Sequence, residues 1–138
     1  MWNSTRIMAE SIAKGIKEVD PQVSVKVFNI ARRDKNDVIT EIFKSKGIVL
    51  GSPTINKGYL SAIAALLEEI RGLGFKEKKA TAFGSYGWSG EAVKLISDRL
   101  RESGWQVVNE GLKIQWKPDD VGIGLSIEFG KQVAKQLD

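Results

Sequence analysis

Strand-like and helix-like segments alternate along the whole chain. The strand-like segments are short apolar or alternating runs at residues 23–30, 47–50, 79–83 and 105–116. Around them, apolar residues recur every three or four positions, which is the spacing of one helix face. Strict alternation favours an α/β fold, a doubly wound parallel sheet with helices on both faces and right-handed crossovers. A chain of 138 residues suits one such domain.

The expected helices carry start and stop signals. Asn3 or Ser4 is a suitable N-cap for the first helix, and Pro21 follows its end. Pro118 suits the first turn of the last helix. Within the last strand-like segment, residues 109–111 interrupt the alternation and predict a bulge or a break.

The chain opens on a helical pattern, which is unusual for a fold of this kind. A ligand loop at residues 1–5 makes sense only if a strand precedes it, so we expect the sheet to lack its first strand in this chain. Residues 23–30 would then lack a neighbour to pair with. The expected organisation is one domain, residues 1–138, truncated at its N-terminus.

Three loops with the composition of a ligand site follow or replace strand ends. They cover residues 1–5, 51–58 and 83–90. In open α/β sheets, ligands bind at the carboxyl ends of the strands, so these loops should converge. Glycines let the backbone approach a ligand closely, and Tyr86 and Trp88 offer flat apolar faces. The pattern predicts a cradle for a planar aromatic cofactor.

Composition excludes several classes of site. The chain has no cysteine and no histidine, so thiol catalysis, disulfides and imidazole-ligated metals are excluded within it. We expect no catalytic residue and no metal ligand here. The net charge is +4 with dispersed basic residues, which argues against a nucleic-acid surface. No apolar run approaches the roughly 20 residues that span a bilayer, and a cysteine-free chain fits a reducing, cytoplasmic compartment.

Three motifs carry a family resemblance. They are Met-Trp-Asn-Ser-Thr at 1–5, Gly-Ser-Pro-Thr-Ile-Asn-Lys-Gly at 51–58 and Phe-Gly-Ser-Tyr-Gly-Trp-Ser-Gly at 83–90. With them, the sequence resembles the flavodoxin-like fold and, more narrowly, the flavodoxin domain of flavodiiron proteins, including flavorubredoxin-type nitric oxide reductases. The similarity extends over essentially the whole chain, including Trp-Lys-Pro at 116–118.

The resemblance implies FMN as the cofactor and assigns residues to its parts. The first group would hold the phosphate, the second would border the isoalloxazine ring, and the third would hold the other side of the ring. In chain order they are Trp2, Asn3, Ser4 and Thr5; Ser52, Pro53, Thr54, Ile55, Asn56 and Gly58; Ser85, Tyr86, Gly87, Trp88, Ser89 and Gly90.

Simpler interpretations of the same residues stay open. Asn3 to Thr5 are also what a helix cap needs, and Ser89 is a suitable cap for the fourth helix. A loop tryptophan such as Trp88 is otherwise often a core residue. Lys57 is either a solvated lysine or a cation close enough to the flavin to raise its reduction potential. Trp105 and Trp116 are expected to be packing residues.

The resemblance implies an electron-transfer domain of a flavodiiron nitric oxide or oxygen reductase. Electrons would come from a rubredoxin-type or NAD(P)H-linked donor. They would pass to a diiron site in a metallo-β-lactamase-like domain of the same or a neighbouring subunit, in a homo-oligomer. This chain lacks the histidines for that site, so alone it would only carry electrons.

Two other functions are weighed against this one. The alternative is a free-standing flavodoxin-type carrier or small flavin reductase. A receiver-type signalling module needs acidic residues at strand ends, where this chain has Gly51 and Ser52. Nucleotide triphosphate binding is not predicted, because the chain has no G-x-x-x-x-G-K-[ST] motif.

Overall fold

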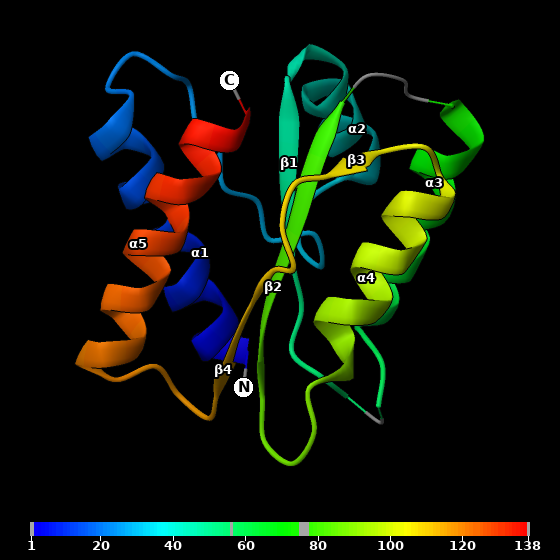
Figure 1. Ribbon diagram of the computed structural model, residues 1–138. Coiled ribbons are helices and arrows are strands. Elements are labelled where there is room, and N and C mark those ends of the chain that lie inside the picture. The colour runs from blue at the N-terminus through cyan, green and yellow to red at the C-terminus, as the bar shows by residue number, and fades with distance from the viewer. Residues whose placement is uncertain (1, 56, 75–77, 138) are drawn as a thin grey trace.

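A computed structural model of the chain describes residues 2–55, 57–74 and 78–137, with only the backbone of Trp2. Helices and strands alternate as predicted over most of the chain (Figure 1). In order they are α1 Trp2–Val19, α2 Lys35–Lys44, β1 Gly47–Gly51, α3 Ser61–Leu73, β2 Lys79–Tyr86, α4 Glu91–Glu102, β3 Gln106–Val107, β4 Leu112–Gln115 and α5 Asp120–Leu137.

The sheet is parallel and is organised around β2. This strand pairs with β1 along one edge, from Gly47 opposite Lys79 to Gly51 opposite Phe83. Along its other edge it pairs first with β3 and then with β4. The predicted interruption at 109–111 is therefore a break that divides one strand position into two short strands.

β2 is longer than the sequence pattern predicted. The expected strand ended at Phe83, with Gly84 and Ser85 in the loop. In the structure it continues to Tyr86, because β4 pairs with residues 83–86 and supplies the hydrogen bonds that keep them extended. Ser85 is therefore a strand residue.

The predicted strand at residues 23–30 is wrong. This segment forms no strand, and within the described residues no strand lies along the outer edge of β1. Its apolar side chains divide between the two cores: Val23 and Val25 pack with the α1–α5 cluster, and Phe28 and Ile30 with the other. Alternation makes a strand only where a neighbour completes the ladder.

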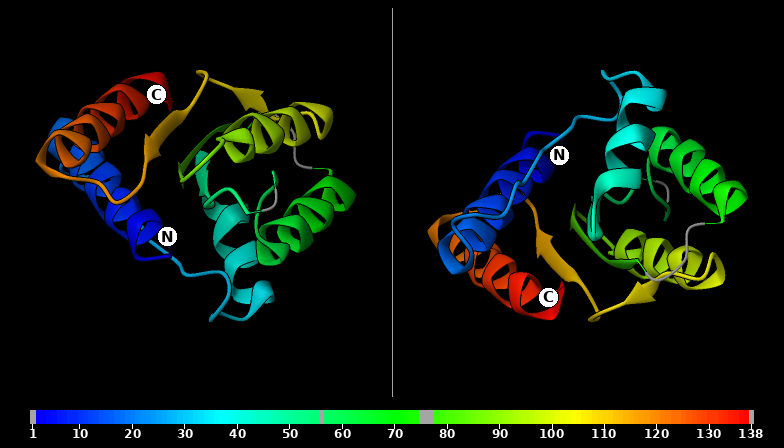
Figure 2. Two further views of the ribbon diagram at one scale, coloured as in Figure 1. Left: turned by 90° about the horizontal axis from the view of Figure 1, so that it is seen from below. Right: turned by 90° about the horizontal axis from the view of Figure 1, so that it is seen from above.

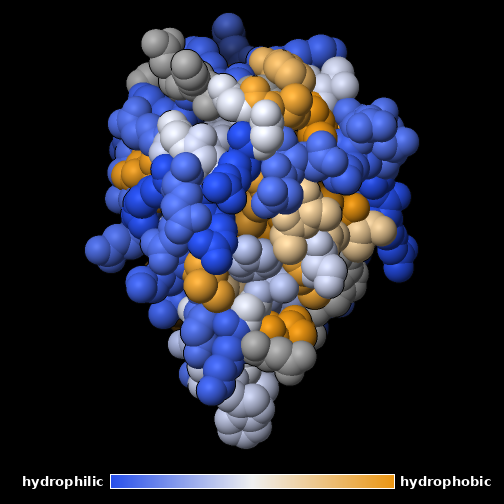
Figure 3. Space-filling view, turned by 90° about the vertical axis from the view of Figure 1, so that its right-hand side faces the viewer, coloured by the Kyte–Doolittle hydropathy of each residue, from blue (hydrophilic) through white to orange (hydrophobic). Residues whose placement is uncertain are grey.

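Helices cover both faces of the sheet (Figure 2). On one face, α2, α3 and α4 enclose the larger core, in which Leu66, Ile70 and Ile96 are fully buried. On the other face, α1 and α5 pack on Phe83. The outer surface over α3 and α4 is largely hydrophilic, with patches of hydrophobic residues between the hydrophilic ones (Figure 3).

Two glycines allow α1 and α5 to touch along their backbones. A Cβ atom at Gly15 would lie 2.0 Å from the carbonyl oxygen of Ile127, and one at Gly130 would lie 2.1 Å from that of Ile12. Any side chain at either position would push the helices apart. None of the described helices has both the length and the apolarity needed to cross a membrane.

Candidate functional site

The three predicted loops meet at the carboxyl edge of the sheet. Oγ1 of Thr5, at the start of α1, lies 3.1 Å from Oγ of Ser85, near the end of β2. The backbone N–H of Thr54, after β1, donates to the carbonyl oxygen of Ser85 at 2.9 Å. Figure 1 shows the N-terminal end of α1 beside the loops that follow β1 and β2. The predicted convergence is confirmed by these contacts.

The start of α1 has the properties of an anion site. The helix begins at Trp2, so Asn3 and Ser4 lie in its first turn. The prediction that one of them is the N-cap is therefore wrong. Asn3 is exposed, whereas Ser4 and Thr5 are buried. The first turn has no acidic side chain, and the first N–H groups of a helix have no partner within it. These N–H groups and the helix dipole together favour a negative charge. The side chain of Trp2 lies outside the described residues.

Ser52 holds its own loop together. Its side chain is fully buried, and its hydroxyl donates to the carbonyl oxygen of Pro53 at 2.8 Å. Oγ of Ser52 also accepts a hydrogen bond from the backbone N–H of Leu60 at 3.0 Å, which joins the two ends of the loop. Pro53 is also buried. Ser52 and Pro53 thus shape the loop from below, and the exposed residues of the loop are the ones that can meet a ligand.

The tip of this loop is a tight turn. Ile55 and Gly58 exchange backbone hydrogen bonds, with N···O distances of 2.9 and 2.8 Å. Lys57, with φ of +64°, adopts the left-handed conformation at this turn. The structure does not require glycine at position 58, because a Cβ atom there would meet only the carbonyl oxygen of Ile55, at an ordinary contact distance of 3.7 Å. Asn56, predicted to contact the ring edge, lies outside the described residues.

Thr54 links the second loop to α4. Its Oγ1 accepts the backbone N–H of Ala92 at 3.2 Å, in the first turn of that helix. The N-cap position is occupied by Gly90, which has no side chain to offer, so Thr54 supplies the cap from a different segment. The alternative role of Ser89 as this cap is therefore wrong. Ser89 and Gly90 are half-buried beside the third loop.

The third loop presents one aromatic ring to solvent. Ser85 and Gly87 are buried and Tyr86 is half-buried, with Nζ of Lys113 at 5.9 Å from the centre of its ring. The indole of Trp88 is 92% exposed. Trp88 is thus not a core residue. A large apolar ring this exposed beside an anion site is a suitable face for a planar ligand.

Sequence reasoning missed one aromatic residue at this edge. Trp105 is buried, so its predicted packing role is confirmed. Trp116 is 51% exposed, and its ring centre lies 5.5 Å from that of Trp88 at an interplanar angle of 80°. Trp116 directly follows β4, which ends beside β2 at the same edge. That position at the carboxyl end of a strand was the available signal.

The charged pairs with shifted pKa values lie on helix surfaces and outside the three loops. A hydrogen bond from Lys26 lowers the pKa of Glu41 and attaches the 23–30 segment to α2. On α4, the carboxylate of Glu102 raises the pKa of Arg99. These pairs stabilise helix surfaces and do not set the charge of the candidate site.

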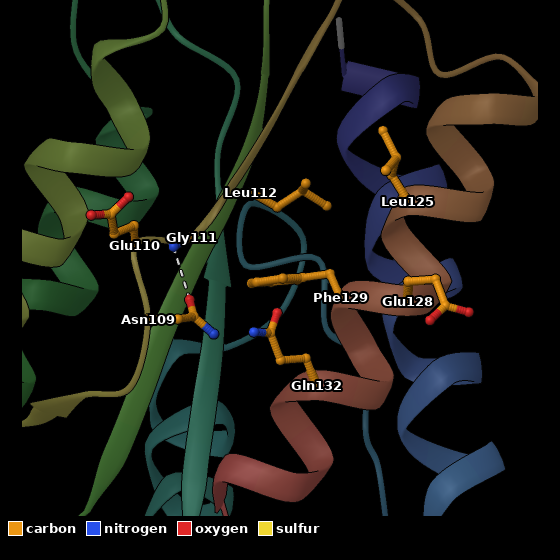
Figure 4. A pocket seen from close by; sticks show the side chains of 8 residues that line it. All are labelled: Asn109, Glu110, Gly111, Leu112, Leu125, Glu128, Phe129 and Gln132. Atoms are coloured by element: carbon orange, nitrogen blue, oxygen red, sulfur yellow. Dashed lines mark hydrogen bonds between the residues drawn. The ribbon is translucent and has the colours of Figure 1, made fainter.

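A groove between the β3–β4 connection and α5 lies apart from the predicted residues (Figure 4). It has a volume of about 560 Å³ and an apolar floor that includes Leu112 and Phe129. Its rim carries the carboxylates of Glu110 and Glu128, which would repel a phosphate. The full lining is Asn109, Glu110, Gly111, Leu112, Leu125, Glu128, Phe129 and Gln132. The three converging loops therefore remain the better site for an anionic planar ligand.

Comparison with known proteins gives relatives for almost the whole chain. Residues 1–130 match the family described as flavodoxin. An anaerobic nitric oxide reductase flavorubredoxin from Aliivibrio fischeri is 53% identical over 136 residues, which is 99% of this chain and 27% of that protein. The chain thus spans about a quarter of the length of this relative.

Solved structures share the same fold. The rubredoxin oxygen:oxidoreductase from Desulfovibrio gigas superimposes with a TM-score of 0.92 at 29% identity, over 99% of this chain and 34% of that one. A flavodoxin from the domain Archaea gives 0.86 at 30% identity, over 99% and 92% of the two chains. The predicted α/β fold is confirmed by these superpositions. By its sequence and its fold, the chain belongs to the flavodoxin family.

Proposed function

We propose that this chain is the FMN-binding electron-transfer domain of a flavodiiron nitric oxide or oxygen reductase. The flavodoxin family implies FMN, and the described residues suit both ends of that molecule. The start of α1, with Ser4 and Thr5, suits the phosphate, and Trp88 offers a flat face for the ring. The contact between Thr5 and Ser85 carries the proposal, because it brings the anion site and the aromatic loop to one edge of the sheet.

The chain's own residues would bind and orient the cofactor. Backbone N–H groups of α1 would hold the phosphate, and residues 53–58 and 86–90 would border the ring from two sides. In this arrangement the buried Ser52 would support the loop at 52–58. The buried Ser85 would hold the hydroxyl of Thr5 in place. Bound FMN would supply the one- and two-electron chemistry that side chains lack.

The longer relatives support a place in a larger protein. One is described as an anaerobic nitric oxide reductase and another as a rubredoxin oxygen:oxidoreductase. We therefore propose a rubredoxin-type or NAD(P)H-linked donor and a diiron acceptor in another domain, of the same or a neighbouring subunit of a homo-oligomer. The chain contains no histidine, so an acceptor site with imidazole ligands would lie outside its 138 residues.

The domain boundaries stay part of the proposal. β1 consists of apolar residues and glycine, and its outer edge has no strand partner within the described residues. An open apolar edge of this kind favours pairing with another strand. We propose that residues 1–138 are one FMN domain whose sheet accepts a further strand there. The cytoplasmic location stays a prediction.

One observation favours the free-standing flavodoxin as a second candidate. The archaeal flavodoxin is matched over 92% of its length, so a domain of this size exists as a protein of its own. The two candidates differ in the partner that must receive the electrons. A domain of a flavodiiron protein should pass them to a diiron region, and a free-standing carrier should not depend on one.

Two measurements test the proposal in sequence. FMN is first titrated with the chain while quenching of flavin fluorescence is followed, and we expect saturation at one FMN per chain. The FMN-loaded, photoreduced chain is then mixed with nitric oxide in a stopped-flow instrument, with and without the remainder of the Aliivibrio fischeri relative. Faster reoxidation with that remainder supports the flavodiiron function, whereas equal rates support the free-standing carrier. No binding of FMN would contradict both.

A further inference from the structure

Trp116 adopts a backbone conformation that bulky residues rarely take. Its φ is +61°, in the left-handed region that favours glycine. The conformation is held by a hydrogen bond in which its backbone N–H donates to the carbonyl oxygen of Tyr86 at 2.7 Å. Left-handed residues of this kind are often found at functional sites, where the surrounding structure fixes them. The ring of Trp116 is thereby directed at the loop that follows β2.

The ring of Trp116 lies against that loop and leaves no room for a side chain beneath it. A Cβ atom at Gly87 would be 2.9 Å from Cζ3 of Trp116. Beside this contact, Nε2 of Gln115 donates to the carbonyl oxygen of Gly87 at 3.0 Å. Gln115, the last residue of β4, and Trp116, which follows it, therefore both contact the backbone of Gly87, next to Trp88.

The same residue is the aromatic neighbour of Trp88. With 92% of its surface exposed, its indole has little core contact to restrict its rotamers. The edge of one indole meets the face of the other at 5.5 Å and 80°, which is a favoured aromatic geometry. Trp116 is itself half exposed, so the pair does not serve to fill the core.

We propose that Trp116 is a positioning residue that orients the indole of Trp88 for the bound flavin ring. This inference rests on the proposed function, because it takes FMN as the ligand that Trp88 meets. An aromatic face that is already oriented loses less rotamer freedom on binding, and the affinity rises accordingly. Trp116 need not touch the flavin for this effect.

The test uses variants that separate position from stability. Trp116→Gly removes the packing of the ring but suits the left-handed backbone, so the two effects offset each other and the thermal midpoint should change little. We expect Trp116→Gly and Trp88→Ala each to weaken FMN binding roughly two- to tenfold, the range to which aromatic pair energies correspond. The double variant should bind no more weakly than Trp88→Ala alone, because both changes remove the same oriented ring.

A second readout requires no cofactor. The paired indoles should give an exciton-coupled circular dichroism signal that both single variants abolish and that Trp105→Phe, at the buried tryptophan, retains. Additive losses of affinity, or unchanged affinity in Trp116→Gly, would overturn the inference while leaving FMN binding by the native chain in place. If the native chain binds no FMN at all, the proposed function fails, and this inference fails with it.

Discussion

The two loops that border the candidate ring site are held in different ways. The loop at 52–58 is held mostly by its own hydrogen bonds, through the Ser52 hydroxyl and the reciprocal bonds of Ile55 and Gly58, and Thr54 joins it to β2 and α4. The loop at 86–90 is held from outside, by Gln115 and Trp116 at the end of β4. Because most of the contacts that hold the two loops differ, substitutions can weaken the support of one loop at a time.

The difference also explains which of the supporting contacts the sequence could reveal. The hydrogen bonds within the loop at 52–58 join residues that are close in sequence, so a local pattern such as Gly-Ser-Pro-Thr at 51–54 indicates them. An externally held loop depends on residues about thirty positions away, which only the folded sheet brings near. The variants below probe each loop separately, in order of decreasing effect.

Ser52→Ala should have the largest effect on stability. The buried hydroxyl is lost, and the backbone N–H of Leu60 loses its acceptor, which costs about 1–3 kcal/mol of unfolding free energy. The matched control is Ser97→Ala, since the buried Oγ of Ser97 has no hydrogen-bond partner among the described residues and its removal should be neutral or slightly stabilising. Denaturant unfolding measures both. Equal losses of unfolding free energy in the two variants would show that the hydroxyl of Ser52 does not stabilise the loop.

Two glycine substitutions should separate the two loops next. Gly87→Ala places a methyl group against the ring of Trp116 and should displace it, with a loss of about 1 kcal/mol and of the indole coupling signal. Gly58→Ala meets only ordinary contact and has no left-handed φ, so it should be neutral or stabilise the chain by up to about 1 kcal/mol. Thermal unfolding and circular dichroism compare them. If Gly87→Ala changes neither stability nor the indole signal, the contact with Trp116 does not support the loop at 86–90.

Gln115→Ala should have a smaller and more local effect. The half-buried hydrogen bond to the carbonyl oxygen of Gly87 is worth about 0.5–1.5 kcal/mol. Amide hydrogen exchange should therefore quicken in residues 86–90 and stay unchanged in residues 52–58. Faster exchange in both loops would show that they are one unit.

Lys57→Ala should leave stability nearly unchanged, because alanine meets the same left-handed backbone as lysine. If Lys57 lies near the flavin, loss of its charge should lower the reduction potential by roughly tens of millivolts. Potentiometric titration of the FMN-loaded chain measures this. An unchanged potential would make Lys57 a solvated lysine and would end its proposed role.

Local patterns predicted most of the fold, and pairing decided the rest. The apolar spacing of Met8, Ile12 and Ile16 is a local property, and the structure buries all three. Residues 23–30 carry a good strand pattern but form no ladder, whereas the four residues of β4 form one because β2 lies beside them. The end of β2 was misplaced for the same reason.

At the candidate site, the loops could be predicted and their supports could not. Ser4, Thr5 and Trp88 belong to the loops that were expected to converge and do converge, and their contact with FMN stays a prediction. The cap of α4 by Thr54 and the contact of Trp116 with Trp88 join segments that are distant in sequence. Single-sequence patterns contain no distance information of this kind.

The measurement that tests the central claim most directly is an NMR titration of the ¹⁵N-labelled chain with FMN. The account predicts that shifted amides cluster at residues 2–5, 52–58 and 85–90, at the edge where Thr5 meets Ser85. The groove between Asn109 and Gln132 serves as the internal control and should show no shifts. Shifts confined to that groove, or none at saturating FMN, would contradict the account.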